Sequence, residues 1–423
     1  RSKYSGLRIS KEAATILAMR VALYEGSWEK YHKGTKFATE DNHTEFFQEV
    51  MKWGDEQFFK SKLALNTKDT DKEYVNAEDA FAHLFNKKDL SQIQEAVLWK
   101  KYSVADGVFH RLGALLASGA VDGQGPSGLS KSLVDNYLNA DGTFINPKDE
   151  KYKDFNEMFK ERDARLLVTV MHSGPDCKYR ASSPTNKPMN VRAYDATGTE
   201  DEMKEKNEDI VSPNLNGDGN SKSVTGFHIR LGIDTTYVDN ESETVVVLFR
   251  YAVGLLCYAE AAEELDLCTD DVLNKTLKPL RERAGVTYVK PTKADPNFPF
   301  TGLSPVLQEI RRERRSELAL QGFRLDDLMR WAVAGTLKGQ DGRGRGAYLG
   351  EDGVLYKSFS PKGRESLKLV LKDNDGWTDP LQQYLPQGYL FDLNRDYLLP
   401  IPPDELQLNR ELKQNPGWGD ANE

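Results

Sequence analysis

Two short acidic segments have residue types and spacings that could do chemistry. In the first, ERDAR, Glu161 and Asp163 lie two residues apart, so an extended backbone would place both carboxylates on one side. A pair of carboxylates held a few ångströms apart is what glycosidase chemistry requires. The adjacent Arg162 and Arg165 supply counter-charges, which favours ion pairing over catalysis. No catalytic residue is therefore assigned.

The second segment has oxygen-bearing side chains in the order of a calcium-binding loop. Asn214, Asn216 and Asp218 stand at alternate positions, and Gly219 follows them. Such a loop needs a glutamate at its twelfth position, where this sequence has Thr225. A turn is the favoured interpretation and a weak structural calcium site the alternative. No other cofactor is indicated, because the histidines and the three cysteines form no zinc-ligand pattern.

A third group of charges lies where a helix should be apolar. Leucine, valine and isoleucine residues at helical spacing precede the sequence RRERRSE: Leu303, Val306, Leu307 and Ile310. Continuing that stripe brings Glu313, Arg314 and Glu317 to the inward face. Because an unpaired buried charge costs several kcal/mol, these side chains are predicted to form an internal ion-pair network joined by Arg324. The network is interpreted as structural rather than catalytic.

Helices must position these groups, and their boundaries can be predicted. Gly322 suits the left-handed residue that ends a helix, and Asp326 or Asp327 can cap the next one. Three residues of that next helix are expected to face inward: Leu325, Leu328 and Trp331. Near the start of the chain, Ser10 is predicted to cap a helix reaching about Trp28. Its expected apolar face consists of Ala13, Ile16, Leu17, Val21 and Tyr24.

Composition excludes several classes of protein. The net charge of −9 argues against nucleic-acid binding, which needs a basic surface. No apolar run reaches the roughly 18 residues that span a bilayer. Eighteen Tyr, eighteen Phe and six Trp are more rings than a modest core needs. Surplus rings often line carbohydrate sites, because the apolar face of a sugar packs on an aromatic plane.

Five motifs, in order, resemble those of the SusD/RagB family and span nearly the whole chain. The segment from Glu313 to Trp331 has the pattern ERxxELxxxGxRxxDLxRW, and Tyr397 to Trp418 contains PIP followed by QNPGW. The remaining three stretches are SLVDNYLNADG (132–142) with ERDARL (161–166), TGFHIR (225–230) and FRYAVGLLCYAEAAEEL (249–265).

The resemblance implies a mainly α fold, in which tetratricopeptide-like helical hairpins form an α-α superhelix with long irregular loops and few short strands. It implies one domain, 1–423, that lacks its N-terminal part. Its expected subdivisions are a tetratricopeptide-like helix (1–31), a polar helical insertion (32–85), a loop-rich ligand-binding region (86–240), and helical hairpins with the C-terminal motifs (241–423).

The resemblance also implies a function. Members capture nutrients at the surface of Bacteroidetes without cleaving them. They pass the ligand to a SusC-like, TonB-dependent transporter and are held in the outer membrane by a lipidated N-terminal cysteine. The chain opens at Arg1 without that cysteine, so the anchor is expected in a part absent from this chain. Glycans are the favoured ligand, oligopeptides the RagB-like alternative, and glycoside hydrolysis a third hypothesis.

Ligand contacts in this family come partly from loops after the RDxRL segment, which map to residues 172–237. The aromatic candidates there are Tyr179, Tyr194, Phe227 and Tyr237, and the hydrogen-bond donors are Arg180, Asn190 and Arg192. Tyr102 and His110, after VLWKKY, are secondary candidates.

Overall fold

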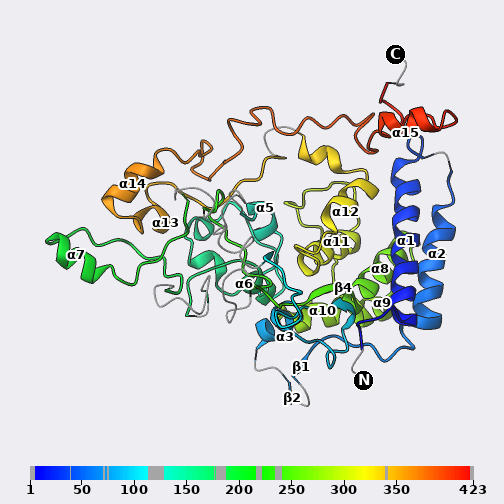
Figure 1. Ribbon diagram of the computed structural model, residues 1–423, viewed down its shortest axis with the longest axis horizontal. Helices are drawn as coiled ribbons and strands as arrows, with labels where there is room; N and C mark the ends of the chain where they lie inside the picture. Colours follow the sequence, from blue (N-terminus) through cyan, green and yellow to red (C-terminus); the bar gives the residue numbers. More distant parts are fainter. Residues whose placement is uncertain are drawn as a thin grey trace.

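The computed structural model describes residues 5–38, 40–69, 72–73, 76–112, 128–175, 177, 187–215, 222–233, 241–338 and 342–419. These residues are mainly helical, with short two-stranded sheets, which confirms the predicted fold class. The longer helices gather in one half of the molecule, on the right of Figure 1. Irregular chain and short helices make up the other half.

The longest helix, α1 (Lys11–His32), begins as predicted, since the Ser10 side chain accepts a hydrogen bond from the Ala13 N–H at 3.3 Å. Helix α2 (His43–Trp53) continues through a π-helical turn (Gly54–Phe58). It packs along α1, as Figure 1 shows, and both contact α8 (Tyr251–Glu264). The predicted polar region 32–85 therefore supplies a partner helix for α1, together with α3 (Ala77–Asn86).

The side of α1 that is buried differs in part from the predicted one. Ala13 and Ile16 are buried as expected, whereas Leu17 is 49% and Val21 60% exposed. The reason is that α1 carries apolar residues on two sides. Helices α2 and α8 cover the side that also bears Met19, and α12 (Arg324–Arg330) contacts α1 as well but leaves Leu17 and Val21 exposed.

Helix α8 is buried on nearly every side and is followed by α9 (Asp270–Lys275) and α10 (Leu277–Arg283). Gly285 ends this pair in the left-handed conformation, at φ 68°. Strand β4 (Val246–Arg250) leads into α8 and pairs antiparallel with β3 (Ala96–Lys100). The second sheet pairs β1 (Lys68–Asp69) with β2 (Lys72–Glu73).

Helices α11 (Pro305–Glu317) and α12 (Arg324–Arg330) are separated by Gly322, whose φ of 84° confirms the predicted break. Neither aspartate caps α12, because the helix begins at Arg324 and both aspartates lie within its first turn, where Asp327 pairs with Arg314. Leu328 and Trp331 are buried as expected, but Leu325 is 59% exposed.

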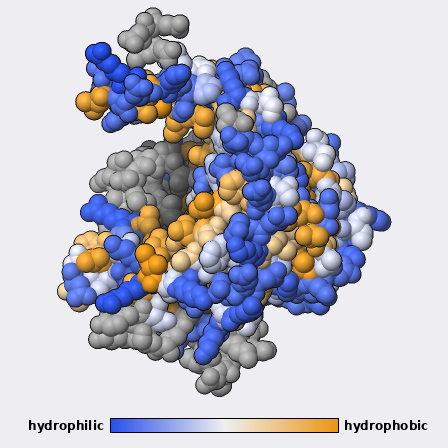
Figure 2. All heavy atoms as spheres, turned by 90° about the vertical axis from the view of Figure 1, so that its right-hand side faces the viewer, coloured by the Kyte–Doolittle hydropathy of each residue, from blue (hydrophilic) through white to orange (hydrophobic). Residues whose placement is uncertain are grey.

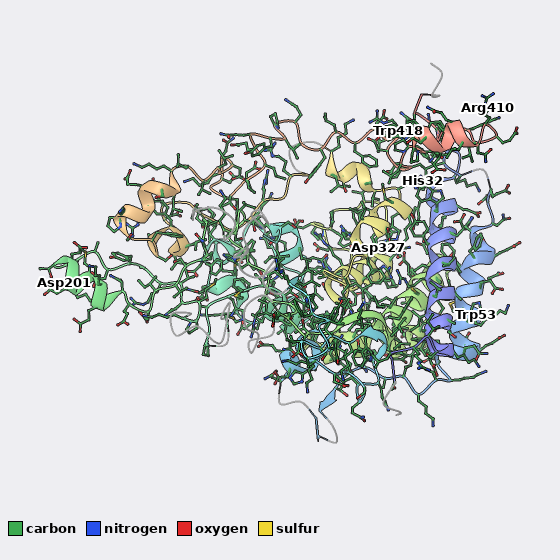
Figure 3. The ribbon with its side chains drawn as sticks, in the orientation of Figure 1. His32, Trp53, Asp201, Asp327, Arg410 and Trp418 are labelled. Atoms are coloured by element: carbon green, nitrogen blue, oxygen red, sulfur yellow. The ribbon has the colours of Figure 1, made fainter. Side chains whose placement is uncertain are left out.

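The other half of the molecule has its own core, made largely of loop residues such as Phe155, Phe227 and Trp377. Its short helices are α5 (Lys131–Val134), α6 (Ala164–Thr169), α7 (Glu200–Lys206), α13 (Val354–Lys357) and α14 (Pro361–Leu367), with 3₁₀ turns at Glu150–Lys153 and Glu157–Phe159. A further 3₁₀ turn, Ala334–Leu337, packs beside α12 in the helical half. Helix α7 projects furthest, with Asp201 near its tip in Figure 3.

The C-terminal part returns to the helical half. The Tyr397 ring meets that of His32, at the end of α1, with centroids 4.6 Å apart. Beyond α15 (Pro403–Leu408), the indole of Trp418 donates to the Leu398 carbonyl at 2.9 Å. Figure 3 shows His32 and Trp418 at the same end of the molecule. Among the described helices, none is long and apolar enough to cross a membrane.

Close packing of α8 on the π-helical turn leads to the first prediction. A Cβ atom at Gly254 would lie 2.2 Å from Cε2 of Phe58, whose ring is itself buried. Gly254→Ala should therefore lower the free energy of unfolding by about 1–3 kcal/mol, despite the better helix propensity of alanine. Urea denaturation measures the change. Gly174→Ala is the control, because its Cβ would meet nothing closer than 3.5 Å; equal effects of the two variants would contradict the prediction.

Candidate ligand-binding surface and the charge network that supports it

A buried carboxylate, Glu317, joins three separate segments. It is 0% exposed and accepts hydrogen bonds from Arg165 of α6 at 2.6 Å, from Arg250 at the end of β4, and from Arg283 of α10. Glu95 shares two of these arginines, binding Arg250 at 2.8 Å and Arg283 at 3.2 Å. Burial alone would raise the pKa of Glu317, but Arg283, Arg250 and Arg165 together hold it well below its usual range.

The same helix carries a second set of ion pairs. Glu313 binds Arg165 and, at 3.2 Å, Arg281. Glu309 bridges Arg281, at 2.5 Å, and Arg312. Every one of these side chains is at most 4% exposed. Because each charge has partners, the cost of burying it is offset and α11 is fixed against α6 and α10.

A third set links α11 to α12 and α8. The Arg314 guanidinium donates to Asp327 at 2.8 Å. Arg330 donates to both oxygens of Glu260, at 2.6 and 2.7 Å, and the Trp331 indole donates to the same carboxylate at 2.6 Å. Burial raises the pKa of Glu260, but Arg330 outweighs it and lowers the value to about 2.

The predicted fourth member, Arg324, makes no ion pair with any described residue. Its guanidinium lies over the Phe300 ring, 5.3 Å from the centroid. The prediction placed it in the network because it is close in sequence, but the turn at Gly322 directs it to a different neighbour.

The acidic pair of ERDAR does not converge either. Asp163 caps α6, is 1% exposed and binds Arg165 at 2.7 Å, whereas Glu161 is exposed and has a left-handed backbone (φ 55°). The segment is therefore not extended, which was the premise for placing the two carboxylates on one side.

Three of the predicted ligand-contacting residues share one face. Met189 and Val191 are buried, and the half-buried Asn190 and Arg192 alternate with them; Tyr194, also half-buried, follows the exposed Ala193. The backbone there is extended, since Asn190 pairs with Val211 in an isolated antiparallel bridge. We call Asn190, Arg192 and Tyr194 the 190–194 strip.

Asp209 completes the strip. Its carboxylate accepts from the Asn190 amide at 3.0 Å and from the Arg192 guanidinium, which also donates to the Lys206 carbonyl at 2.7 Å. The Arg192 side chain is 41% and that of Asp209 63% exposed, so both retain hydrogen-bonding capacity toward solvent. The sequence offered no local signal for Asp209, because the contact depends on the pairing of residues 190 and 211.

A second ring lies close to this strip. The Tyr194 N–H donates to the Lys357 carbonyl at 2.7 Å, and Arg364 donates to the same carbonyl at 2.9 Å. The Arg364 guanidinium lies over the half-buried Tyr356 ring, 5.7 Å from its centroid. Tyr356 and Arg364 were not among the predicted residues, since they are far from the strip in sequence.

Tyr102 and His110 form a separate pair, with ring centroids 4.5 Å apart. His110 also contacts the Thr244 carbonyl at 2.8 Å and lines a pocket of about 380 Å³ beside β4. The walls of this pocket are mostly aliphatic, from residues such as Val247 and Leu248. It offers little open aromatic surface, because Phe85 and Phe323 are both 8% exposed.

Phe227 is a correction to the predicted site. It is 0% exposed and packs in the core against Phe155, with ring centroids 6.2 Å apart, so it presents no surface to a ligand. Tyr179, Arg180 and Tyr237 lie outside the described residues, as do Asn216 and Asp218 of the calcium candidate. Asn214 is described: its N–H donates to the His228 ring at 3.2 Å. In the described ranges, no three His, Cys, Asp or Glu side chains converge as a metal site.

Comparison with known proteins identifies the family. The SusD family model matches residues 92–418, most of the chain. The chain belongs to the SusD family. This confirms the resemblance found in the five sequence motifs, all of which lie within the matched range.

Solved structures of SusD-like proteins share the fold. One, a SusD-like carbohydrate-binding protein from Bacteroides fragilis, is 21% identical with a TM-score of 0.61, and the match covers 98% of this chain and 66% of that one. Another SusD-like protein from the same species is 18% identical with a TM-score of 0.58, covering 99% and 67%. The chain thus spans about two-thirds of their length. No curated protein sequence matches it.

Within this SusD-family chain, the motif residues build the scaffold. Glu313, Arg314 and Glu317 belong to the motif at 313–331. Arg165 belongs to ERDARL (161–166) and Arg250 to the motif at 249–265, and ion pairs join these segments. The 190–194 strip lies outside these motifs. The scaffold is therefore encoded by the motifs, and the surface is formed by the loops it supports.

Removing the central carboxylate tests the network. Glu317→Gln would leave Arg165, Arg250 and Arg283 with less compensation in a dry interior, so the free energy of unfolding should fall by about 3–5 kcal/mol. Urea denaturation at neutral pH measures this loss. Glu365→Gln, which breaks an exposed pair with Lys368, should change it by less than about 1 kcal/mol. A Glu317→Gln variant as stable as the control would contradict the role of the network.

The depressed pKa of Glu260 predicts a loss of stability in acid. Its value of about 2 in the folded chain lies below the ordinary 4.5, so the unfolded state binds the proton more readily. The resulting stabilisation, about 3 kcal/mol, is complete above pH 4.5 and is lost as the pH falls toward 2. The difference in unfolding free energy between wild type and Glu260→Gln should shrink over that interval. A constant difference would show that Glu260 does not titrate there.

Proposed function

We propose that this chain is the ligand-capturing part of a cell-surface protein that binds glycans without cleaving them. Membership of the SusD family supports the proposal, as does the carbohydrate-binding character of the Bacteroides fragilis protein with the same fold. The observation that carries it is the 190–194 strip, a partly exposed row of hydrogen-bonding groups beside a tyrosine ring.

The chemistry of the strip suits a sugar. Arg192 and Asn190 donate hydrogen bonds and Asp209 accepts them, which matches the mixed donor and acceptor character of adjacent hydroxyls. Tyr194 supplies a ring against which the apolar face of a pyranose can pack. Because the strip is open rather than enclosed, an internal stretch of a long chain can lie along it.

The positions of the carboxylates that the sequence singled out support binding without catalysis. A glycosidase needs an acid and a second carboxylate on either side of the scissile bond. Asp163 is committed to Arg165, Glu313 and Glu317 are shared among arginines, and Glu161 stands apart from them on the surface. The ligand would be captured intact and passed to a SusC-like, TonB-dependent transporter, with the whole protein anchored in the outer membrane by a lipid.

Binding measurements on strip variants test the proposal. Affinity electrophoresis against plant, host and microbial polysaccharides identifies a ligand, and calorimetry then gives its Kd. Arg192→Ala and Tyr194→Ala should each weaken binding by about 10-fold, the worth of one charged hydrogen bond or one ring contact. Their folding should be little changed, because the Arg192–Asp209 pair is exposed.

Matched controls lie outside the strip. Arg410→Ala and Tyr384→Ala remove an exposed arginine and an 80% exposed tyrosine that are not part of the strip, and should leave Kd unchanged. Figure 3 shows Arg410 far from Asp201 of α7, which follows the strip in the chain. Equal losses in strip and control variants would refute the site. Binding of peptides alone would replace glycans by oligopeptides, and release of shorter sugars would refute capture without cleavage.

A further inference from the structure

Two cationic side chains lie over the ring of Tyr356, beside the 190–194 strip. The Arg364 guanidinium is 5.7 Å from the ring centroid and the Lys372 ammonium is 5.9 Å from it. Within the described part of the chain, neither cation forms an ion pair with an acidic side chain. All three side chains are half-buried, so a ligand can reach them. We call these three residues the Tyr356 cluster.

Arg364 leaves most of its hydrogen-bonding capacity unused. A guanidinium carries five N–H donors. One hydrogen bond from Nη2 reaches the Lys357 carbonyl at 2.9 Å, and the Nε–H is buried without an acceptor among the described residues. A partly buried cation without a counter-charge is unfavourable, and an anionic group on a ligand would supply both the charge and the acceptor oxygens.

The backbone holds the Tyr356 cluster next to the strip. The Tyr194 N–H donates to the same Lys357 carbonyl at 2.7 Å, so Tyr194 and Arg364 are neighbours around one oxygen atom. The Ser212 and Ser358 hydroxyls are hydrogen-bonded to each other, and Ser212 lies one residue beyond the backbone bridge that extends the strip. A ligand lying along the strip would therefore pass beside the two cations.

Acidic side chains of this region have other partners. Asp209 binds the arginine of the strip, and Asp352 accepts from a tyrosine hydroxyl at 2.7 Å. Glu365, on the same helix as Arg364, binds Lys368 at 2.6 Å. The whole chain has a net charge of −9 and would repel a polyanion, so a preference for an acidic ligand requires a local site of this kind.

The pocket beside β4 differs from this surface. Its walls are mostly aliphatic, which suits alkyl groups better than sugar hydroxyls. Figure 2 shows hydrophobic residues gathered beside a hollow on the face of α1 and α2. Helices α13 and α14, which carry Tyr356 and Arg364, lie at the opposite end of the molecule in Figure 1. The charged surface and the apolar pocket are therefore separate.

We propose that the glycan bound at the strip is acidic, and that Arg364 and Lys372 hold a carboxylate or sulfate group on it. The inference rests on the proposed function, because it names the class of glycan that the same surface takes. The planar guanidinium matches two oxygens of such a group, and the ammonium adds a second positive charge. The sugar that carries the group packs beside Tyr194.

Matched polysaccharides separate the charge from the shape of the sugar. Calorimetry compares polygalacturonate with its carboxyl-reduced form, and chondroitin sulfate with its desulfated form. Wild type should bind one acidic polymer about 10-fold or more tightly than its modified form, because charged hydrogen bonds are lost. Added salt should weaken this preference, since the cations are only partly buried. Loss of binding on carboxyl reduction identifies a uronic acid, and loss on desulfation identifies a sulfate ester.

Variants of the Tyr356 cluster locate the contact. Arg364→Gln and Lys372→Gln should each weaken binding of the acidic polymer by about 5–10-fold and leave binding of the modified form unchanged. Lys368→Gln is the control, because it removes an equal charge that is already paired, and should change Kd by less than about 2-fold. Urea midpoints check the fold. Lys372→Gln keeps the test valid if Arg364→Gln destabilises the chain, since the Lys372 side chain forms no hydrogen bond with a described residue.

The outcomes distinguish this inference from the proposed function. Tighter binding of a neutral polysaccharide, or equal affinity for an acidic polymer and its modified form, would overturn the acidic ligand and leave glycan capture intact. Equal losses in Lys368→Gln and the cluster variants would overturn the assignment to Arg364 and Lys372. Binding of peptides alone, or of no polysaccharide, would refute the proposed function and this inference with it.

Discussion

The fold depends on one carboxylate. Glu317 binds Arg165, Arg250 and Arg283, which come from α6, the start of α8 and α10, so a single side chain fixes α11 against three segments far apart in sequence. Arginine keeps its charge in proteins, so none of the three partners can escape by losing a proton. An arrangement that separated Glu317 from these arginines would leave an unpaired cation in the protein interior, which is unfavourable. Burying charged side chains gains less free energy than burying apolar ones. A charged core nevertheless permits few alternative arrangements of the same helices, because each charge needs its partner.

The sequence predicts the buried charges of α11 but not the residues with which they pair. Glu313, Arg314 and Glu317 continue an apolar stripe, and that local pattern is sufficient to predict burial and hence pairing. Which cations they meet depends on contacts more than 30 residues away, such as the 34-residue separation from Arg283 to Glu317. Periodicity carries no information at that range. The one partner chosen by proximity, Arg324, lies past the turn at Gly322 and stacks on Phe300 instead.

The candidate binding surface also has a part that the sequence predicts and a part that it does not. Asn190, Arg192 and Tyr194 share a face because an extended backbone alternates its side chains, and this was open to prediction once the segment was known to be extended. Phe227 was predicted beside them only because it is aromatic. Aromatic rings are equally suited to a hydrophobic core, and Phe227 is buried in one. Asp209 reaches the strip only through the pairing of residues 190 and 211.

The errors at Leu17, Val21 and Leu325 are of a different kind, since all three lie on correctly predicted helices and all are too exposed rather than too buried. Hydrophobic periodicity shows which faces of a helix are apolar, but it does not show whether a neighbouring segment covers each of them. Fully burying side chains of this size is worth about 1.5–3 kcal/mol each, against a total stability of about 5–15 kcal/mol for a typical domain. Leu17 and Val21 line a pocket of about 200 Å³ together with Phe323, the residue before α12, and Arg314 of the ion-pair network. The exposed apolar side chains and the buried charges therefore meet at one junction of α1, α11 and α12.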